Sequence, residues 1–350
     1  MTAKGDKIRI GILGASGYTG ADLVRLLATH PQAEIELLTA NTQAGRPLAA
    51  VYPHLGGLDL PDLIRGEEAD WEGVDVAFCG LPHGTTQEII AGLPERLKVI
   101  DLSADFRLTD TGTYAQWYGH AHRAPDLQKE AVYGLTEHQR EAIAAARLVA
   151  CPGCYPTAAL LLLLPLVAGG LIETDDIIID AKSGASGGGR SVKESMLFCE
   201  VAEGLHPYAV AGHRHAPEIE QELSGVAGRP LLVNFTPHLV PANRGELLTT
   251  YVRLAPGRRV EDLRRALDAR YADEPFVRLV PEGAVPATRH VRGSNFCLLG
   301  VFADRLPGRA ILVSTLDNLV KGSSGQAIQN MNVMFGLPEI TGLEQQPLFP

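Results

Sequence analysis

Two cysteines stand just before the most apolar run of the chain. They are Cys151 and Cys154, they enclose Pro152 and Gly153, and Pro156 follows. Proline suits the first turn of a helix, so the spacing predicts that a helix begins close to Cys154. The partial positive charge at the amino end of a helix favours the thiolate, which is the nucleophilic form of cysteine. Cys154 is therefore a candidate nucleophile for covalent catalysis.

This pair of cysteines also has other interpretations. A cysteine is often a small buried hydrophobic residue, and two at this spacing can form a redox couple or half of a zinc site. The other three, Cys79, Cys199 and Cys297, are scattered singly and complete no zinc site. A redox couple would open a thioredoxin-like unit, which this pattern is not. We expect no metal ion, and the odd number of cysteines in a long chain argues against a disulfide scaffold.

A second cluster carries proton-transfer chemistry. His213, Arg214 and His215 are consecutive. Histidine exchanges protons near neutral pH, and arginine binds a carboxylate or phosphate through two parallel hydrogen bonds. A single histidine would more often be structural, but the three together favour a functional role. We expect a general base from this cluster and a substrate contact from Arg214.

Three glycines follow the first strand-like run of the chain. Gly14, Gly17 and Gly20 stand between a predicted strand at 8–13 and a predicted amphipathic helix at 21–29. Such glycines permit a tight turn, close approach of a pyrophosphate and close packing of helix on sheet, and the helix amino end favours phosphate. The sequence therefore predicts a dinucleotide site. The other loop residues assigned to it are Ser16, Tyr18 and Thr19.

The end of the second predicted strand, 35–40, indicates which dinucleotide binds. An NAD enzyme usually has a carboxylate there for the ribose 2′-hydroxyl, whereas this chain has Thr39, Asn41 and then Arg46. Hydroxyl, amide and guanidinium groups suit a 2′-phosphate, so NADP(H) is favoured over NAD(H). The alternative is that Arg46 is only a solvated loop residue. Short-chain dehydrogenases share the glycine spacing, but none of the nine tyrosines has the lysine they need four residues later.

The elements that position these residues alternate in the first half of the chain. Apolar runs at 74–80, 97–102 and 148–151 continue the strands already named, with helical patterns between them. This alternation predicts βαβ units in a Rossmann-type, doubly wound parallel sheet, an α/β fold. The run 101–107 follows a strand at its carboxyl end, where such sheets bind ligands.

The second half has longer strand candidates, which predict a mixed or antiparallel sheet with helices on one face. They are 177–182, 231–237, 247–254, 296–303 and 310–316. Glycine-rich runs at 184–189 and 225–230 are expected to be loops, and a last helix is expected at 324–335. The apolar run 158–172 is shorter than the roughly 20 residues that span a bilayer, so we expect a buried helix.

Length and charge bound the class of protein. A chain of 350 residues is longer than a single hydrophobic core usually accommodates. We therefore expect a nucleotide domain at 1–152, completed by 318–350, and a catalytic domain at 153–317. The net charge of -10 argues against nucleic-acid or anionic-membrane partners and favours a small-molecule enzyme. Met1–Lys7 is polar and shows no signal peptide, so a cytoplasmic location is expected.

The motifs together resemble one family, the N-acetyl-γ-glutamyl-phosphate reductases of arginine biosynthesis, across nearly the whole chain. The matching segments are 14–20, 102–107, 152–157, 183–187, 212–215, 235–239 and 317–322. The resemblance implies NADPH-dependent reduction of N-acetylglutamyl 5-phosphate to the 5-semialdehyde through a thioester on Cys154. It also implies a second domain like that of glyceraldehyde-3-phosphate dehydrogenase, a last helix that returns to the nucleotide domain, and dimers or tetramers.

The resemblance also implies roles for single residues. His213 is the first choice for the base and His215 the second, and Arg107 would hold the substrate phosphate by similarity to aspartate-semialdehyde dehydrogenases. The residues implied beside the nicotinamide are Ser183, Gly184, Ser186, Gly187 and Asn318, and Leu81 and Pro82 complete the cofactor set. Cys151 stands where the family often has Asn, so oxidation could link it to Cys154 and silence the enzyme.

Three alternative functions remain at this point. A similar branch reduces a carrier-linked aminoadipate phosphate in lysine synthesis, but it has Asn-Ala-Thr after the cysteine, whereas this chain has Tyr155, Pro156 and Thr157. An aspartate-semialdehyde dehydrogenase would perform the same chemistry on a shorter substrate. A non-catalytic NADP-sensing protein would need neither Cys154 nor the histidines.

Overall fold

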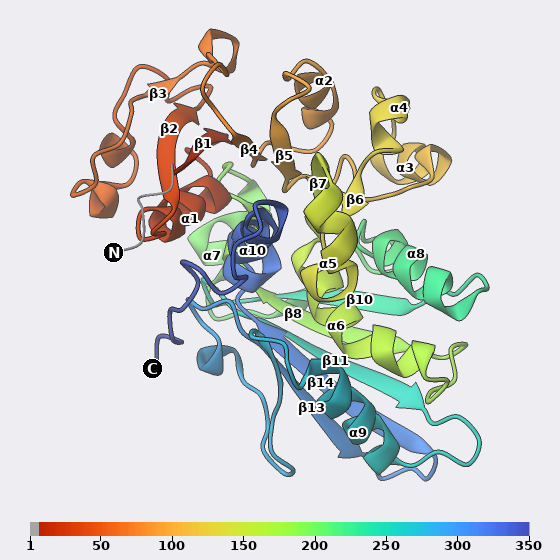
Figure 1. Cartoon of the computed structure of the whole chain (residues 1–350). Coiled ribbons are helices and arrows are strands. Elements are labelled where there is room, and N and C mark those ends of the chain that lie inside the picture. Colours follow the sequence, from red (N-terminus) through yellow and green to blue (C-terminus); the bar gives the residue numbers. More distant parts are fainter. Residues whose placement is uncertain (1–6, 350) are drawn as a thin grey trace, which may run out of the picture. The chain divides into compact units, whose positions relative to one another are not determined.

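The computed structural model describes residues 7–349, so most of the polar segment Met1–Lys7 lies outside the described residues. The described chain forms two compact units (Figure 1). One contains the residues up to 152 together with 323–344, and the other contains 153–322 together with 345–349. Each unit is described by itself. No helix within 7–349 combines the length and the apolar character needed to cross a membrane.

The first unit is built on a parallel sheet. Its seven strands have the order β3-β2-β1-β4-β5-β7-β6, and every neighbouring pair is parallel. The strands are β1 (Ile8–Leu13), β2 (Ala33–Thr39), β3 (Leu63–Ile64), β4 (Val76–Cys79), β5 (Lys98–Asp101), β6 (Val132–Tyr133) and β7 (Leu148–Ala150). The strand order reverses between β1 and β4, which is the point where doubly wound sheets bind ligands. The predicted Rossmann-type fold is confirmed.

Helices connect the strands of this unit, and one of them comes from the far end of the chain. They are α1 (Tyr18–Leu27), α2 (Thr86–Ala91), α3 (Thr111–Tyr118), α4 (Pro125–Gln128), α5 (Thr136–Ala145) and α10 (Gly325–Met334). Every residue of α10 is buried, and the helix contacts α1, α5 and β5. Two of its buried side-chain amides bind partners inside the unit: Asn330 Nδ2 donates to the carbonyl of Gly134 at 2.9 Å, and Asn332 Oδ1 lies 3.0 Å from His30 Nε2.

The second unit is built on a mixed sheet of seven strands in the order β12-β13-β14-β11-β8-β10-β9. The strands are β8 (Ile178–Gly184), β9 (His206–Pro207), β10 (Asn234–Val240), β11 (Glu246–Arg253), β12 (Val277–Leu279), β13 (Cys297–Ala303) and β14 (Arg309–Leu316). The β8–β10 and β12–β13 pairs are parallel and the others are antiparallel. Alternate residues of β11 are buried and half-exposed, so one face of the sheet is covered.

The covering helices include the most apolar segment of the chain. The helices of this unit are α6 (Cys154–Ala168), α7 (Phe198–Val201), α8 (Ala216–Ala227) and α9 (Val260–Tyr271). Figure 1 shows α6, α8 and α9 along the sheet, and α6 contacts β11, β14, α8 and α9. The predicted helix at 158–172 is confirmed as buried, but it begins at Cys154 and ends before Gly169 and Gly170, the latter with φ +56.

Two predicted boundaries in this unit are wrong. The strand predicted from Leu231 starts at Asn234, because the amides of Leu231 and Val233 donate to side chains of α8 instead, to Ser224 Oγ at 2.9 Å and Glu220 Oε1 at 3.1 Å. The loop predicted at 225–230 is helical as far as Ala227. A left-handed Gly228, with φ +66, then ends the helix.

Replacing Gly20 by alanine should destabilise the first unit. A Cβ at Gly20 would lie 2.5 Å from the carbonyl oxygen of Gly14, whereas one at Gly17 would meet that oxygen only at 3.4 Å. Overpacking costs about 1–3 kcal/mol, so Gly20→Ala should lower the free energy of unfolding by about that amount and Gly17→Ala by less. Denaturant unfolding followed by circular dichroism measures both, and equal losses would contradict this account.

Candidate functional site

The glycine loop of the first unit leaves no space for a side chain at Gly14. Gly14 has φ +82, and a Cβ there would lie 2.6 Å from the carbonyl oxygen of Gly80. Gly17 precedes the first residue of α1 and provides no capping side chain. The first N–H groups of α1 therefore have no side-chain cap, as in helix amino ends that bind phosphate.

The residues predicted to choose the cofactor differ in their environment. Thr39 is buried at the end of β2, where its hydroxyl lies 3.4 Å from the amide of Gly14 and its carbonyl accepts from Ala15 at 2.9 Å. Asn41 and Arg46 are exposed, and Arg46 Nη1 donates to a neighbouring Gln43. No carboxylate stands at the end of β2.

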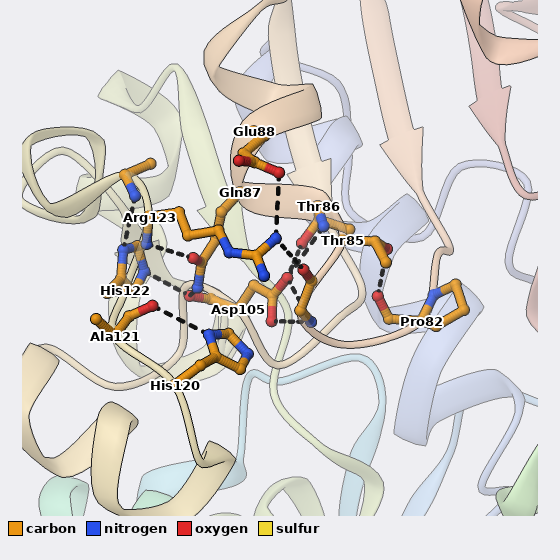
Figure 2. Close-up of polar contacts among 12 residues, drawn as sticks. Pro82, Thr85, Thr86, Gln87, Glu88, Asp105, His120, Ala121, His122 and Arg123 are labelled. Carbon is orange, nitrogen blue, oxygen red and sulfur yellow. Dashed lines mark hydrogen bonds and ion pairs between the residues drawn. The ribbon is translucent and has the colours of Figure 1, made fainter.

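A buried carboxylate organises the loops that follow β4 and β5. Asp105 accepts hydrogen bonds from the amide of Gly84, from the amide and hydroxyl of Thr86 and from the hydroxyl of Tyr114, at 2.7–3.0 Å. Figure 2 shows this centre, where Nε2 of His122 donates to the backbone carbonyl of Asp105 at 2.8 Å. Because its own chain supplies four donors, Asp105 shapes the loop rather than facing a ligand.

Arg107, predicted to bind the substrate phosphate, is also buried in the first unit. Its Nε donates to the carbonyl of Cys151 at 2.7 Å, and Nη2 donates to the carbonyl of Leu102 at 3.1 Å. Asp101 lies in the same region with its carboxylate bonded by Ser103. Burial raises the pKa of Asp101 to about 7, and the charge of Arg107 opposes that rise.

In the second unit, the predicted nucleophile is the first residue of α6. Cys154 is partly exposed, and Gly153 precedes it as the N-cap. The amide of Gly153 donates to Oε1 of Glu218 at 2.8 Å, and a Cβ on Gly153 would lie only 2.4 Å from Nε2 of His215. The imidazole of His215 therefore lies against the backbone beside the nucleophile.

His213 occupies a more apolar position than His215. The two ring centroids are 4.7 Å apart, and Nδ1 of His213 accepts from the amide of His215 at 3.1 Å. The aromatic rings that meet His213 edge-on are Tyr155, Tyr208 and Phe235. Burial lowers the pKa of His213 to about 4, and the charge of Arg214 adds to that effect. His213 is therefore neutral at physiological pH.

Sequence analysis did not single out one buried carboxyl group of the second unit. Glu246 is fully buried at the start of β11. None of the described residues donates a hydrogen bond to either of its carboxyl oxygens. Burial dominates and raises the pKa of Glu246 to about 8, and the Asp317 carboxylate adds to the rise.

The residues predicted beside the nicotinamide form a separate hydrogen-bonded cluster in the second unit. Asn318 accepts from the amide of Gly245 and donates to the hydroxyl of Ser186, both at 2.9 Å. Gly184 admits no side chain, because a Cβ would lie 2.9 Å from the carbonyl of Ala242. Ser183 is buried with its hydroxyl directed to the carbonyl of Gly184 at 3.3 Å.

The structure thus groups the predicted site residues into three sets within the units. The glycine loop lies with Thr39, the nucleophile with both histidines, and Ser183–Gly187 with Asn318. Arg214 and Pro82 are exposed, and Leu81 is half-buried. Sequence analysis missed Glu218 and Glu246. For Glu246 a signal existed, because it shares the inward phase of β11 with Leu248, Thr250 and Val252.

Replacing Asp105 should reduce stability in a pH-dependent way. Burial alone would raise the pKa of Asp105, but the hydrogen bonds from Thr86, Gly84 and Tyr114 outweigh it and hold the pKa below its usual range. A carboxylate whose pKa is lowered by folding stabilises the folded protein at pH values above its unfolded pKa of about 3.9. This stabilisation is lost as the pH falls through the folded pKa. Asp105→Asn should therefore cost about 1.5–3 kcal/mol at pH 7 and less in acid.

Unfolding by urea at pH 7 and at pH 3 measures this difference. The control is Asp126→Asn, which removes an exposed carboxylate paired with Lys129 and should leave the free energy of unfolding nearly unchanged at both pH values. A cost at Asp105 that does not vary with pH would contradict the account.

Comparison with protein families covers both units. A model of the semialdehyde dehydrogenase NAD-binding domain matches residues 9–146, and a model of the semialdehyde dehydrogenase dimerisation domain matches residues 154–318. Among solved structures, aspartate semialdehyde dehydrogenase II of Vibrio cholerae, complexed with ASA, has a TM-score of 0.72 at 18% identity, covering 95% of this chain and 99% of its own. The Candida albicans aspartate semialdehyde dehydrogenase with NADP has a TM-score of 0.66 at 18% identity, with 94% and 99% covered. These structures establish the fold.

Relatives of much higher identity extend over the whole chain. The N-acetyl-gamma-glutamyl-phosphate reductase of Rhodospirillum rubrum is 63% identical over 350 residues, with 99% of each chain covered. A probable chloroplastic N-acetyl-gamma-glutamyl-phosphate reductase of Oryza sativa subsp. japonica is 58% identical, covering 99% of this chain and 83% of its own. Since identity at this level spans both units, the chain belongs to the N-acetyl-gamma-glutamyl-phosphate reductase family.

Proposed function

We propose that this chain reduces N-acetylglutamyl 5-phosphate to N-acetylglutamate 5-semialdehyde with NADPH and releases phosphate, through a thioester on Cys154. The relatives' names support the substrate. The observation that carries the chemistry is the position of Cys154 as first residue of the buried helix α6, with His215 against the adjacent Gly153. A thiol in this position is stabilised as thiolate and is held rigidly for attack on a carbonyl.

We assign proton transfer to His215 in preference to His213. The residue beside the nucleophile is packed directly against Nε2 of His215. His213 lies among aromatic rings, and its lowered pKa makes it a weak base at neutral pH. In this assignment His213 orients its neighbour, because its Nδ1 accepts the His215 amide. The order of preference from sequence is thereby reversed.

We propose NADP(H) as the cofactor, because the first unit fits it. Gly14 and Gly20 have no room for a Cβ, so the turn is tight and α1 packs closely on it, and Gly17, the N-cap of α1, leaves its backbone open to a pyrophosphate. The end of β2 has no carboxylate to repel a 2′-phosphate. The remaining cofactor-binding candidates are Ser16, Gly17, Tyr18, Thr19, Thr39, Asn41, Arg46, Leu81, Pro82, Ser183, Gly184, Ser186, Gly187 and Asn318. The bound nicotinamide supplies a hydride. The chain orients the thioester and excludes water from it.

Arg107 and Arg214 are our candidates for the anionic groups of the substrate. Arg214 is exposed, so its guanidinium can reach a carboxylate or phosphate without a desolvation cost. Arg107 follows β5, at the carboxyl edge of a parallel sheet where ligands bind. Its donors to the carbonyls of Cys151 and Leu102 fix the direction of its side chain.

We further propose a homodimer or homotetramer in the cytoplasm. One of the matching family models is described as a dimerisation domain. The second face of the β8–β14 sheet is half-exposed and presents apolar Leu247, Tyr251 and Ile311, as a face covered by another subunit would. A reducing compartment agrees with five cysteines that form no disulfide in the described chain.

Replacing Cys154 by serine tests the covalent step. Cys154→Ser should retain NADP binding, measured by calorimetry, and lose activity by about 10³-fold or more. Activity is measured in reverse, with NADP, phosphate and N-acetylglutamate semialdehyde, and aspartate semialdehyde should be a far poorer substrate. Cys151→Ser is the matched control, because Cys151 is buried against Asn330 and should be dispensable for turnover.

An active Cys154→Ser variant would refute covalent catalysis at this sulfur, and an inactive Cys151→Ser variant would mean that the other cysteine is the nucleophile. A preference for aspartate semialdehyde would refute the proposed substrate.

Asparagine substitutions distinguish the two histidines. His215→Asn should lower kcat by about 10²–10⁴-fold, the usual contribution of a positioned acid–base group. His213→Asn should lower it less, because a neutral ring among aromatic side chains acts only by orientation. Steady-state kinetics from pH 6 to 9 measures both losses. A larger loss for His213→Asn would mean that His213 is the base, as the sequence analysis preferred.

A further inference from the structure

The turn that follows β14 is held by one buried side chain. Asp317 has no exposed surface, and its Oδ1 accepts from the amides of Leu319 and Val320 at 2.9 and 3.3 Å. Its Oδ2 accepts from the amide of Gly293 at 2.7 Å, and Nη1 of Arg244 lies 3.4 Å from Oδ1. A carboxylate that accepts several backbone amides restricts the chain around it. Hydrogen bonds within the second unit therefore fix the backbone of this turn.

Gly322 ends the turn and lies against the nucleophile. Its amide donates to the backbone carbonyl of Asp317 at 3.0 Å. A Cβ at Gly322 would lie 2.7 Å from Cβ of Cys154, 3.2 Å from its Cα and 3.2 Å from a methyl carbon of Leu316. The backbone of Gly322 is not left-handed, so its conformation does not require glycine. What requires glycine here is the close approach to Cys154.

The same turn carries one of our cofactor-binding candidates. Asn318 follows Asp317 directly, and its side chain links the amide of Gly245 to the hydroxyl of Ser186. Residues Val320–Ser324 then form a π-helical turn, a conformation that is frequent at functional sites. A short, restrained segment thus joins a cofactor candidate at its start to a contact with the nucleophile at its end.

We propose that Gly322 is a positioning residue for Cys154, and that the turn at 317–322 sets the position of the sulfur relative to Asn318. This role rests on the thioester reaction proposed above and belongs to a residue that need not touch the substrate. Attack and hydride transfer both require reacting atoms about 3–3.5 Å apart and aligned. Contact between the turn and Cβ of Cys154 is a direct way to impose that alignment on the sulfur.

The start of α6 leaves Cys154 little freedom to move away from the turn. The amide of the preceding Gly153 is bonded to Glu218 at 2.8 Å. The amide and hydroxyl of Thr157 both donate to the carbonyl of Gly153, at 2.9 and 3.0 Å. A methyl group at position 322 would therefore have to displace either the sulfur or the turn. Both displacements change the position of the sulfur relative to Asn318.

The test replaces Gly322 by alanine and measures turnover in the reverse assay with NADP, phosphate and N-acetylglutamate semialdehyde. A displacement of about 1 Å costs about 100-fold in rate, so Gly322→Ala should lower kcat by about that factor. The KM for the semialdehyde and the Kd of NADP should stay within about threefold of the natural values, because binding does not require an aligned sulfur.

The matched control is Gly300→Ala in β13. A Cβ there would lie 2.9 Å from a ring carbon of Phe302 and 3.0 Å from a side-chain carbon of Pro286, so this variant has a similar clash in the same unit without a contact to Cys154. Gly300→Ala should lose stability in urea and keep its kcat. A loss of kcat in Gly322→Ala alone then reports position and not general destabilisation.

A second measurement needs no substrate. With cysteine isotopically labelled at Cβ, the nuclear magnetic resonance signal of Cys154 is assigned by its loss in Cys154→Ser. This signal should move in Gly322→Ala and stay in place in Gly300→Ala. If the natural protein does not turn over N-acetylglutamate semialdehyde, the proposed function is refuted, and the signal still decides whether the turn holds the nucleophile.

Three results would overturn the proposal. A Cys154 signal that stays in place in Gly322→Ala means that the turn does not hold the nucleophile. A kcat within about threefold of the natural value means that this contact has no part in the reaction, and a loss of NADP affinity as large as the loss of kcat means that the site has collapsed.

If Gly322→Ala does not fold, Asp317→Asn decides alone. An asparagine has one acceptor oxygen and cannot accept from both Gly293 and Leu319, so the turn loses part of its support. Its kcat should fall about tenfold or more at unchanged KM, and a natural kcat in this variant overturns the proposal.

Discussion

A buried hydrogen bond from the Gly153 amide to the Glu218 carboxylate joins the amino end of α6 to the first turn of α8. It satisfies a backbone amide that would otherwise have no hydrogen-bond partner at the end of the helix. It also fixes where Cys154 lies relative to His215, the residue that precedes α8. The absence of a side chain at Gly153 is what lets the imidazole come this close. The chemistry of the second unit depends on this one junction between two helices.

The side chains of this part of the second unit lie in different environments. Tyr155, Tyr208 and Phe235 pack edge-on against His213, and burial there lowers the pKa of this histidine. Glu246, at the start of β11, is fully buried, and burial raises the pKa of its carboxyl to about 8. The amino end of α6 favours the thiolate form of Cys154, and His215 lies beside it against Gly153.

Sequence patterns predicted the parallel sheet, the glycine loop and the position of the nucleophile, because these features depend on residues that are close together in the sequence. The glycine loop, the cysteine before an apolar helix and the paired histidines all lie within short segments. Glu246 lies far from Cys154 in sequence, and only the register of β11 with β8 and β14 brings it inward. The late start of β10 likewise depends on α8 side chains that compete for its amides. Such long-range pairings are not encoded in local periodicity.

The helix α6 has consequences for synthesis of the chain. It is apolar on all sides and fully buried along most of its length, and its cover includes β11 and β14, which follow it in the sequence. At roughly 5–20 residues per second on the ribosome, the last of these strands emerges on the order of ten seconds after the helix. During that interval the native cover of the leucine-rich surface is incomplete, so the nascent chain offers a binding site for holdase chaperones before the enzyme is folded.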